Sequence, residues 1–244
     1  MSTAAIPVHV ALVDSSGSID ADELAAVAGA LNEQVQADLA PAWHVAATVG
    51  YYPRPPANTW RIELQRGLDV RGAAGYHSDH NHQPFSKVDI EAGGEWTVTS
   101  SHELVEMLCD PWGSRMHAAA ALPDWQGESR RVRYLLEACD PCEAVSYPVG
   151  GIDVSDFLLP AFYRSSRRGS VSGYSHTGAL AEPLQILPGG YISFMDPATG
   201  HWWQRFVDDS GRHEDRDLGE PDASAASLRE WLDEKAREYR SGGG

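Results

Sequence analysis

The segment from Ser100 to Met107 constrains this chain more than any other feature. His102 and Glu106 are four residues apart, so on a helix their side chains lie on one face, one turn apart. Both side chains could then bind the same cation. Asp110-Pro111 follows closely and predicts where the helix ends. The segment therefore predicts a helix that presents a metal site.

Glu103, next to His102, completes the spacing His-Glu-x-x-Glu. In metallopeptidases with an HExxH motif, the glutamate of the motif is the general base that acts on water at the metal. Glu106 stands where those enzymes have the second histidine, which makes the ion a weaker Lewis acid and admits iron or manganese as well as zinc. A plainer explanation stays open, because Ser100 and Glu103 also have the spacing of a capping box.

Further ligands are expected from a second helix, predicted over residues 130–139. Glu137, near its end, is the candidate third ligand. Asp140, one turn later, is a candidate to orient a ligand histidine through its second ring nitrogen, and Glu143 is an alternative ligand. The predicted metal site thus joins two helices from separate parts of the chain.

Two other groups of residues are candidates that no spacing rule selects. A glycine-containing loop predicted over residues 72–84 carries His77 and His80, either of which could complete the coordination of the ion. Tyr174 and His176 lie in a stretch rich in glycine and serine, and are candidates for stabilising an oxyanion.

The spacing of apolar residues and turn signals predicts a mixture of strands and helices. Strands are predicted at residues 7–13, 43–50, 60–64 and 85–90; helices at 20–40 (capped by Asp20 and closed by Pro41), 100–109, 130–139 and 222–240; and loops at 112–127 and 208–221. No internal repeat or linker is evident. The sequence therefore predicts one α+β domain over residues 1–241, followed by a flexible glycine tail at 242–244.

Composition excludes several classes of partner. The formal net charge of −16 repels phosphate backbones and anionic lipids, so nucleic acid and membrane surfaces are not expected partners. No apolar run is long enough to cross a bilayer, and the amino terminus has no signal-peptide pattern, which predicts a cytoplasmic protein. A peptide or protein substrate is compatible with this surface, and the oligomeric state stays open.

The three cysteines, Cys109, Cys139 and Cys142, are an odd number in a chain without a signal peptide, which argues against a disulfide framework. Arg164, Arg167 and Arg168 form the one basic cluster, which is interpreted as a solvated loop.

The chain resembles a group of bacterial and phage proteins with zincin-like features, and its helix is more distantly similar to that of the gluzincin metallopeptidases. The stretches that carry the resemblance are 30–32, 40–43, 75–77, 101–107 with 110–111, 137–143, 154–157 and 189–193. The resemblance implies a single zincin-like domain with a mixed sheet against the metal helix. It also implies a strand just before that helix, at the edge of the cleft, where an extended peptide could pair. Residues 87–90 and 96–98 are the candidates for that strand.

Two alternative functions remain open at this stage. The first is a non-catalytic binding or structural protein, phage-associated or accessory, on a degenerate zincin scaffold. The second rests on Asp14, Ser16 and Ser18, which look like the D-x-S-x-S signature of von Willebrand factor A modules and would then bind Mg²⁺. The favoured hypothesis is a zinc-dependent hydrolase of the metallopeptidase type, with His102, Glu106 and Glu137 as ligands and Glu103 as base.

Overall fold

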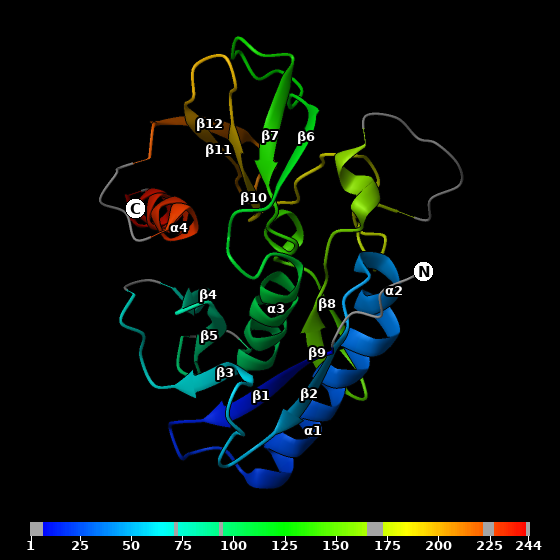
Figure 1. Ribbon diagram of the computed structural model, residues 1–244. Coiled ribbons are helices and arrows are strands. Elements are labelled where there is room, and N and C mark those ends of the chain that lie inside the picture. Colours follow the sequence, from blue (N-terminus) through cyan, green and yellow to red (C-terminus); the bar gives the residue numbers. More distant parts are fainter. Residues whose placement is uncertain (1–6, 71–72, 93–94, 165–172, 222–226, 243–244) are drawn as a thin grey trace, which may run out of the picture. The chain divides into compact units, whose positions relative to one another are not determined.

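The computed structural model describes residues 7–70, 73–92, 95–164, 173–221 and 227–242. The chain forms two compact units (Figure 1), each built from two segments. The first unit holds residues 1–112 and 146–155, and the second holds 113–145 and 156–244. The predicted α+β class is confirmed, whereas the single domain over 1–241 stays a prediction.

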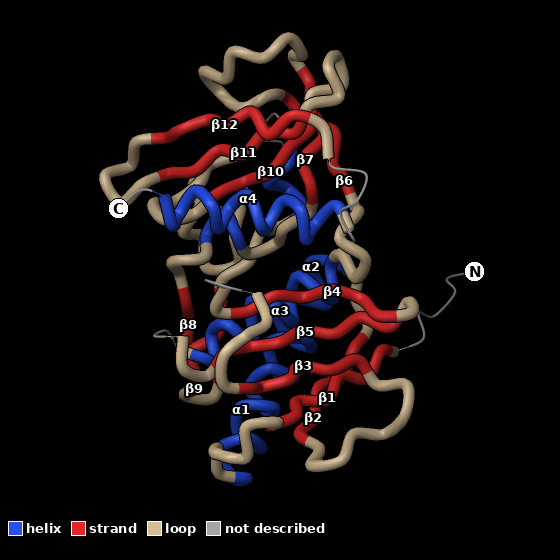
Figure 2. Tube along the Cα trace, turned by 90° about the vertical axis from the view of Figure 1, so that its left-hand side faces the viewer, coloured by secondary structure: helices blue, strands red, loops and turns tan. Residues whose placement is uncertain are grey.

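The first unit contains a five-stranded sheet with α1 and α3 on one face (Figure 2). In chain order its elements are β1 (Val8–Asp14), α1 (Ala21–Glu33), the π-helix η1 (Gln34–Leu39), α2 (Ala40–Trp43), β2 (Ala47–Tyr51), β3 (Trp60–Gln65), β4 (Gly75–His80), β5 (Gln83–Asp89), α3 (Trp96–Cys109), β8 (Ser146–Val149) and β9 (Ile152–Ser155). The strand order is β2-β1-β3-β5-β4, with β4 antiparallel to β5 and the other pairs parallel. β4 is therefore an edge strand of the mixed sheet.

The alternation of residues in β3 explains how this sheet receives its helices. Ile62 and Leu64 are fully buried, while Arg61 and Glu63 between them point to the opposite face. α3 packs against β4 and β5, and α1 packs against β2. The apolar face of the sheet is thus the face that carries the helix with the predicted metal residues.

The loop predicted over residues 72–84 is wrong, because β4 and the start of β5 occupy most of it. The two strands form a hairpin through Asn81 and His82, whose φ angles of 53° and 62° are those of a two-residue turn with left-handed backbone. The polar residues of this stretch obscured the strand in the sequence. His77 consequently sits in a strand and has a fixed direction.

The first helical segment begins as predicted, since the Asp20 side chain accepts a hydrogen bond from Asp22 N. It does not close at Pro41, because the π-helix and α2 carry the helical path on to Trp43. Pro41 lies in the first turn of α2, where the lack of an N–H is tolerated. The helix ends at His44, which has left-handed backbone, and the strand predicted from residue 43 begins at residue 47.

The second unit contains an antiparallel five-stranded sheet and the helix α4. Its elements are β6 (Met116–Ala120), β7 (Arg131–Leu135), the 3₁₀-helices η2 (Asp140–Cys142) and η3 (Pro160–Tyr163), β10 (Tyr191–Met195), β11 (Trp202–Val207), β12 (His213–Gly219) and α4 (Leu228–Gly242). The strand order is β12-β11-β10-β7-β6, and every neighbouring pair is antiparallel.

Three of the sequence predictions in this unit are wrong. The helix predicted over 130–139 is the strand β7, in which buried Val132 and Tyr134 alternate with exposed Arg131 and Arg133. That period of two outweighed the helix-like spacing of the apolar residues. The loops predicted over 112–127 and 208–221 contain β6 and β12, which pair with β7 and β11.

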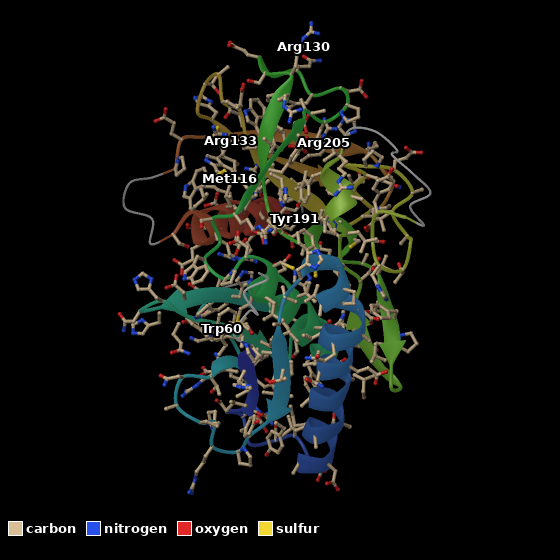
Figure 3. All side chains as sticks on the ribbon, turned by 45° about the vertical axis from the view of Figure 1, so that its right-hand side comes forward. Trp60, Met116, Arg130, Arg133, Tyr191 and Arg205 are labelled. Atoms are coloured by element: carbon tan, nitrogen blue, oxygen red, sulfur yellow. The ribbon has the colours of Figure 1, made fainter. Side chains whose placement is uncertain are left out.

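The core of the second unit joins α4 to the sheet. Trp231 and Leu232 pack with Leu135 and Trp202, and Gln204 of β11 donates a hydrogen bond to the Leu232 carbonyl. Figure 3 labels Arg205, also in β11, whose guanidinium makes a bidentate ion pair with Asp215. The predicted start of this helix at 222 falls outside the described residues, as do residues 243–244 of the tail predicted at 242–244. Gly242, predicted as the first residue of that tail, is the last residue of α4.

Among the residues that the structure describes, no helix has both the length and the apolar character needed to cross a membrane. The three cysteines, Cys109, Cys139 and Cys142, are all buried. Of the predicted basic loop, Arg167 and Arg168 lie outside the described residues.

Candidate metal centre

α3 is a helix that buries most of its surface. Its N-cap is Glu95, and Leu104, Val105 and Met107 are fully buried. Ser100 is therefore well inside the helix and not at its start. The capping-box explanation of Glu103 is wrong, because the capping pattern requires the N-cap position.

His102 and Glu106 face each other on this helix, as their spacing predicts. His102 Nε2 lies 3.5 Å from Glu106 Oε1. The Glu106 side chain is completely buried, whereas that of His102 is 16% exposed. An ion held between these two groups would therefore have one side open to solvent.

His77 approaches the same carboxylates from the edge strand β4. Its Nδ1 lies 3.4 Å from Glu103 Oε2 and 3.8 Å from Glu106 Oε2. One ligand atom from each of these three residues lies within 4.8 Å of the other two, and all three residues are buried. Glu106 thus presents one oxygen to each of two imidazoles.

Gly75, two residues before His77, allows the close approach of α3 to β4. A Cβ atom at this position would lie 2.7 Å from Thr99 Cγ2 and 3.0 Å from Glu103 Oε1. Glu103 is therefore wedged between the glycine and the histidine of one strand. Sequence reasoning named His77 but missed Gly75, since only the packing of α3 on β4 reveals the need for a glycine.

The spacing of these donor atoms suits a divalent ion. With metal–ligand bonds of about 2.0–2.2 Å, two ligands at a tetrahedral angle are about 3.3–3.6 Å apart. Around His77 the separations to Glu103 and Glu106 are 3.4 and 3.8 Å, and between His102 and Glu106 the separation is 3.5 Å, so each of the two donor sets is close to that spacing. Two buried carboxylates also carry a charge that a divalent cation would neutralise.

Glu137 and Asp140 belong to the second unit, and neither lies in a long helix. The Glu137 carboxylate pairs with Arg229, with Oε2 2.6 Å from Nη1, and both side chains are buried. Asp140 begins η2, and Glu143 follows that short helix. Their participation in a metal site stays a prediction, while the second ligand-bearing helix over 130–139 does not exist.

His80 differs from His77 because residues three apart in a strand point to opposite faces of the sheet. His80 is exposed and lines a pocket of about 470 Å³ together with Arg61 and Lys87. Arg61 and Lys87 project from the face of the sheet opposite the buried Ile62 and Val88. Of the two histidines proposed as alternative ligands, the structure therefore brings His77 to the carboxylates of α3.

The candidates for an oxyanion role lie in the second unit. Tyr174 is buried, and its backbone exchanges hydrogen bonds with Leu159 and Leu180. The His176 ring stacks on Phe157 with ring centroids 5.1 Å apart. A catalytic role for either side chain stays a prediction.

Asp14, from the D-x-S-x-S pattern, organises the turn between β1 and α1. Its Oδ1 accepts hydrogen bonds from Ser16 N, Ser16 Oγ and Gly17 N, and its Oδ2 accepts one from Ile19 N. Burial raises the pKa of Asp14, but these hydrogen bonds together outweigh it and lower the pKa below the ordinary value. The carboxylate thus caps a loop, which accounts for the pattern without an ion.

No protein-family model, curated protein or solved structure matches the chain. The chemistry of the centre therefore rests on the geometry of His77, His102, Glu103 and Glu106.

Proposed function

We propose that the protein is a metal-dependent hydrolase of the metallopeptidase type, with its centre on α3. The observation that carries the proposal is the position of Glu106, which is completely buried with an imidazole within 4 Å of each of its oxygens. A buried carboxylate needs a compensating charge, and a histidine supplies one only when it is protonated. A divalent cation meets the same need at neutral pH.

In the proposed centre His102 and Glu106 hold the ion, because His102 is the ligand candidate with solvent access. A bound divalent ion would act as a Lewis acid toward a carbonyl oxygen and toward water. Glu103 is the general base that accepts the proton of the attacking water and delivers it to the leaving amine. His77, whose side chain is buried, orients the Glu103 carboxylate from a distance of 3.4 Å.

A second placement of the ion is supported by one observation, the mutual proximity of donors from His77, Glu103 and Glu106. An ion among these three residues would be enclosed, since their side chains are 1%, 7% and 0% exposed. Glu103 would then be a ligand, and the ion would have a structural role. Either donor set, with one histidine and one or two carboxylates, suits zinc and also iron or manganese.

An extended peptide is the proposed substrate. β4 is the edge strand next to α3, so its outer backbone groups are available for pairing with a further strand. The sequence predicts the peptide-pairing strand at residues 87–90 or 96–98, and both predictions are wrong. Residues 87–89 belong to the interior strand β5, and residues 96–98 begin α3. His77 of β4 lies 3.4 Å from Glu103, and Gly75 of the same strand leaves room for that side chain, so a peptide paired with β4 would lie next to the base.

Elemental analysis of the purified protein tests the proposal. We expect one zinc, iron or manganese ion per chain in the wild type and in His80→Ala, and less than a tenth of that in His102→Ala. His77→Ala retains the ion if His102 and Glu106 hold it, and loses the ion if the enclosed placement is correct. A wild type without stoichiometric metal would remove the proposal.

Glu103→Gln tests the catalytic part with a mixture of fluorogenic peptides as the probe. Removing the base is expected to lower the hydrolysis rate by about 10²–10⁴-fold. The metal content should stay at the wild-type level, because glutamine keeps the shape of the side chain. Full activity in this variant would exclude Glu103 as the base.

The second candidate function is a non-catalytic binding protein on the same scaffold. The substitution of a carboxylate for the second histidine of the HExxH pattern favours it, as does the nearly complete burial of Glu103. This candidate predicts no stoichiometric metal and no hydrolysis, with unchanged folding after His102→Ala. The Mg²⁺-binding alternative predicts instead that metal content depends on Asp14.

A further inference from the structure

A fully buried glutamine of the π-helix, Gln34, lies at the junction of the elements that surround α3. Its Nε2 donates to the Ser155 carbonyl at 3.0 Å and contacts Tyr147 Oη at 3.3 Å. Its Oε1 accepts a hydrogen bond of 2.8 Å from Ser101 Oγ. Every donor and acceptor group of the amide is therefore used, which fixes its orientation.

Ser101 closes the arrangement into a ring. Its hydroxyl donates to Gln34 and accepts a hydrogen bond of 3.0 Å from Ser155 N, so three residues from η1, α3 and β9 bond to one another. All three residues are completely buried. Hydrogen bonds out of contact with water are costly to break, so this ring, the Gln34 ring, resists rotation of α3.

The ring acts next to the metal residues, because Ser101 immediately precedes His102 and Glu103. A rotation of α3 by about 20° would move a side-chain atom about 5.5 Å from the helix axis by about 2 Å. That displacement equals a whole metal–ligand bond of about 2.0–2.2 Å. Small errors in the rotation of α3 would thus move Glu103 and Glu106 away from His77, which lies on β4.

The π-helical backbone at Gln34 is consistent with such a role. π-helical turns are rare, and they are frequently found at functional sites. Here the π-helix η1 carries the buried residues Val35 and Leu39 as well as Gln34. The chain therefore departs from the α-helix at the residue that bonds to the metal-bearing helix.

We propose that Gln34 and Ser101 are positioning residues, which set the rotation of α3 so that Glu103 and Glu106 reach His77 of β4 at the metal site. The inference rests on the proposed metal site, because it concerns the affinity of that site. It does not depend on the identity of the substrate. Neither residue touches the reacting atoms, and both act through α3.

The test measures the affinity for Zn²⁺ in competition with a chromophoric chelator. Ser101→Ala and Gln34→Met are expected to weaken Zn²⁺ binding by about 10–100-fold, as happens when residues that orient metal ligands are removed. The Zn²⁺ affinity of the double variant should equal that of the single variant with the lower affinity, since both substitutions open the same ring. The absorption spectrum of the Co²⁺-loaded protein should change with them.

Two matched controls separate positioning from packing. Ser100→Ala removes a hydroxyl from the preceding residue of α3, where the side chain is equally buried and has no hydrogen-bond partner among the described residues. Gln36→Met removes a glutamine of the same π-helix that bonds to the Ala47 carbonyl of β2. Both controls should keep the wild-type affinity within about 3-fold.

The outcomes distinguish this inference from the proposed function. If wild-type protein binds no Zn²⁺, the proposed function fails and the inference fails with it. If wild type binds Zn²⁺ and Ser101→Ala binds it equally well, the inference alone is overturned. A loss in Ser100→Ala as large as that in Ser101→Ala would also overturn it. Should Gln34→Met not fold, Ser101→Ala decides the question.

Discussion

Two buried glutamates, one in each unit, have their charges compensated in different ways. Glu137 in the second unit is 2.6 Å from the guanidinium of Arg229, a group that is always protonated. Glu106 in the first unit faces His77 and His102 at 3.8 and 3.5 Å. Imidazoles are charged only when protonated, and when neutral they are metal ligands. The first arrangement is a permanent ion pair, and the second can accept a cation.

The comparison also shows what the sequence could not reveal about the candidate ligand Glu137. Its partner Arg229 is 92 residues away and lies on α4. No local pattern relates the two residues. Glu106 and Glu137 each follow an apolar residue and each precede a cysteine by two or three residues. Their local sequences therefore do not distinguish them, and the difference lies in the residues that face their carboxylates.

Removing Arg229, the permanently charged partner of Glu137, should have the largest effect on stability. Arg229→Met leaves Glu137 buried without its guanidinium and is expected to lower the free energy of unfolding by about 3–5 kcal/mol. Urea denaturation followed by tryptophan fluorescence measures the change. Arg66→Met is the control, because the Arg66–Glu91 pair is exposed and should contribute less than about 1 kcal/mol. Equal stability of the two variants would show that burial of the Arg229–Glu137 pair does not matter.

The stability of the site around Glu106, His77 and His102 should depend on metal instead. Adding Zn²⁺ at 100 times its dissociation constant is expected to raise the free energy of unfolding by about 2.7 kcal/mol. Glu106→Gln should abolish this increase, whereas Glu63→Gln on the opposite face of the sheet should preserve it. Thermal melts with Zn²⁺ and with a chelator measure the difference. An increase that survives in Glu106→Gln would place the binding elsewhere.

The turn at Asp14 offers a carboxylate that accepts hydrogen bonds from backbone N–H groups and from the Ser16 hydroxyl. Asp14→Ala is expected to cost about 0.5–2 kcal/mol, as for other side chains that cap backbone N–H groups. Because the pKa of Asp14 is lowered in the folded protein, its stabilisation is present above the unfolded pKa and is lost as the pH falls through the folded value. The variant should lack that part of the acid sensitivity and keep its metal content. Metal loss in Asp14→Ala would support the Mg²⁺-binding alternative.

The smallest effect is expected at an exposed carboxylate. Hydrogen bonds, first from the Ser210 hydroxyl and then from Arg212 N, lower the pKa of Asp208 to about 2. Ser210→Ala should raise this pKa toward the ordinary value, as measured by NMR titration. Because Asp208 is at the surface, global stability should not change detectably. An unaltered pKa in the variant would exclude the Ser210 hydroxyl as the main cause.

Local signals were sufficient for several elements and misleading for others. The N-cap at Asp20, the strands β1 and β3 and the end of α3 at Asp110 follow from short-range patterns that the structure confirms. β4 was hidden by its polar composition, and its direction comes from pairing with β5. β7 was taken for a helix because Val132, Leu135 and Leu136 have a helix-like spacing, whereas pairing with β6 and β10 makes the segment a strand.

By itself, the sequence determined the helix of the centre and the relation between His102, Glu103 and Glu106, because a helix fixes the geometry of residues three and four apart. Only the tertiary structure decided which distant groups join them. His77 reaches the carboxylates because β4 pairs as an edge strand next to α3, and Glu137 is held by Arg229 because α4 packs on the second sheet. Contacts across such sequence separations depend on how whole elements pack, which short-range patterns do not encode.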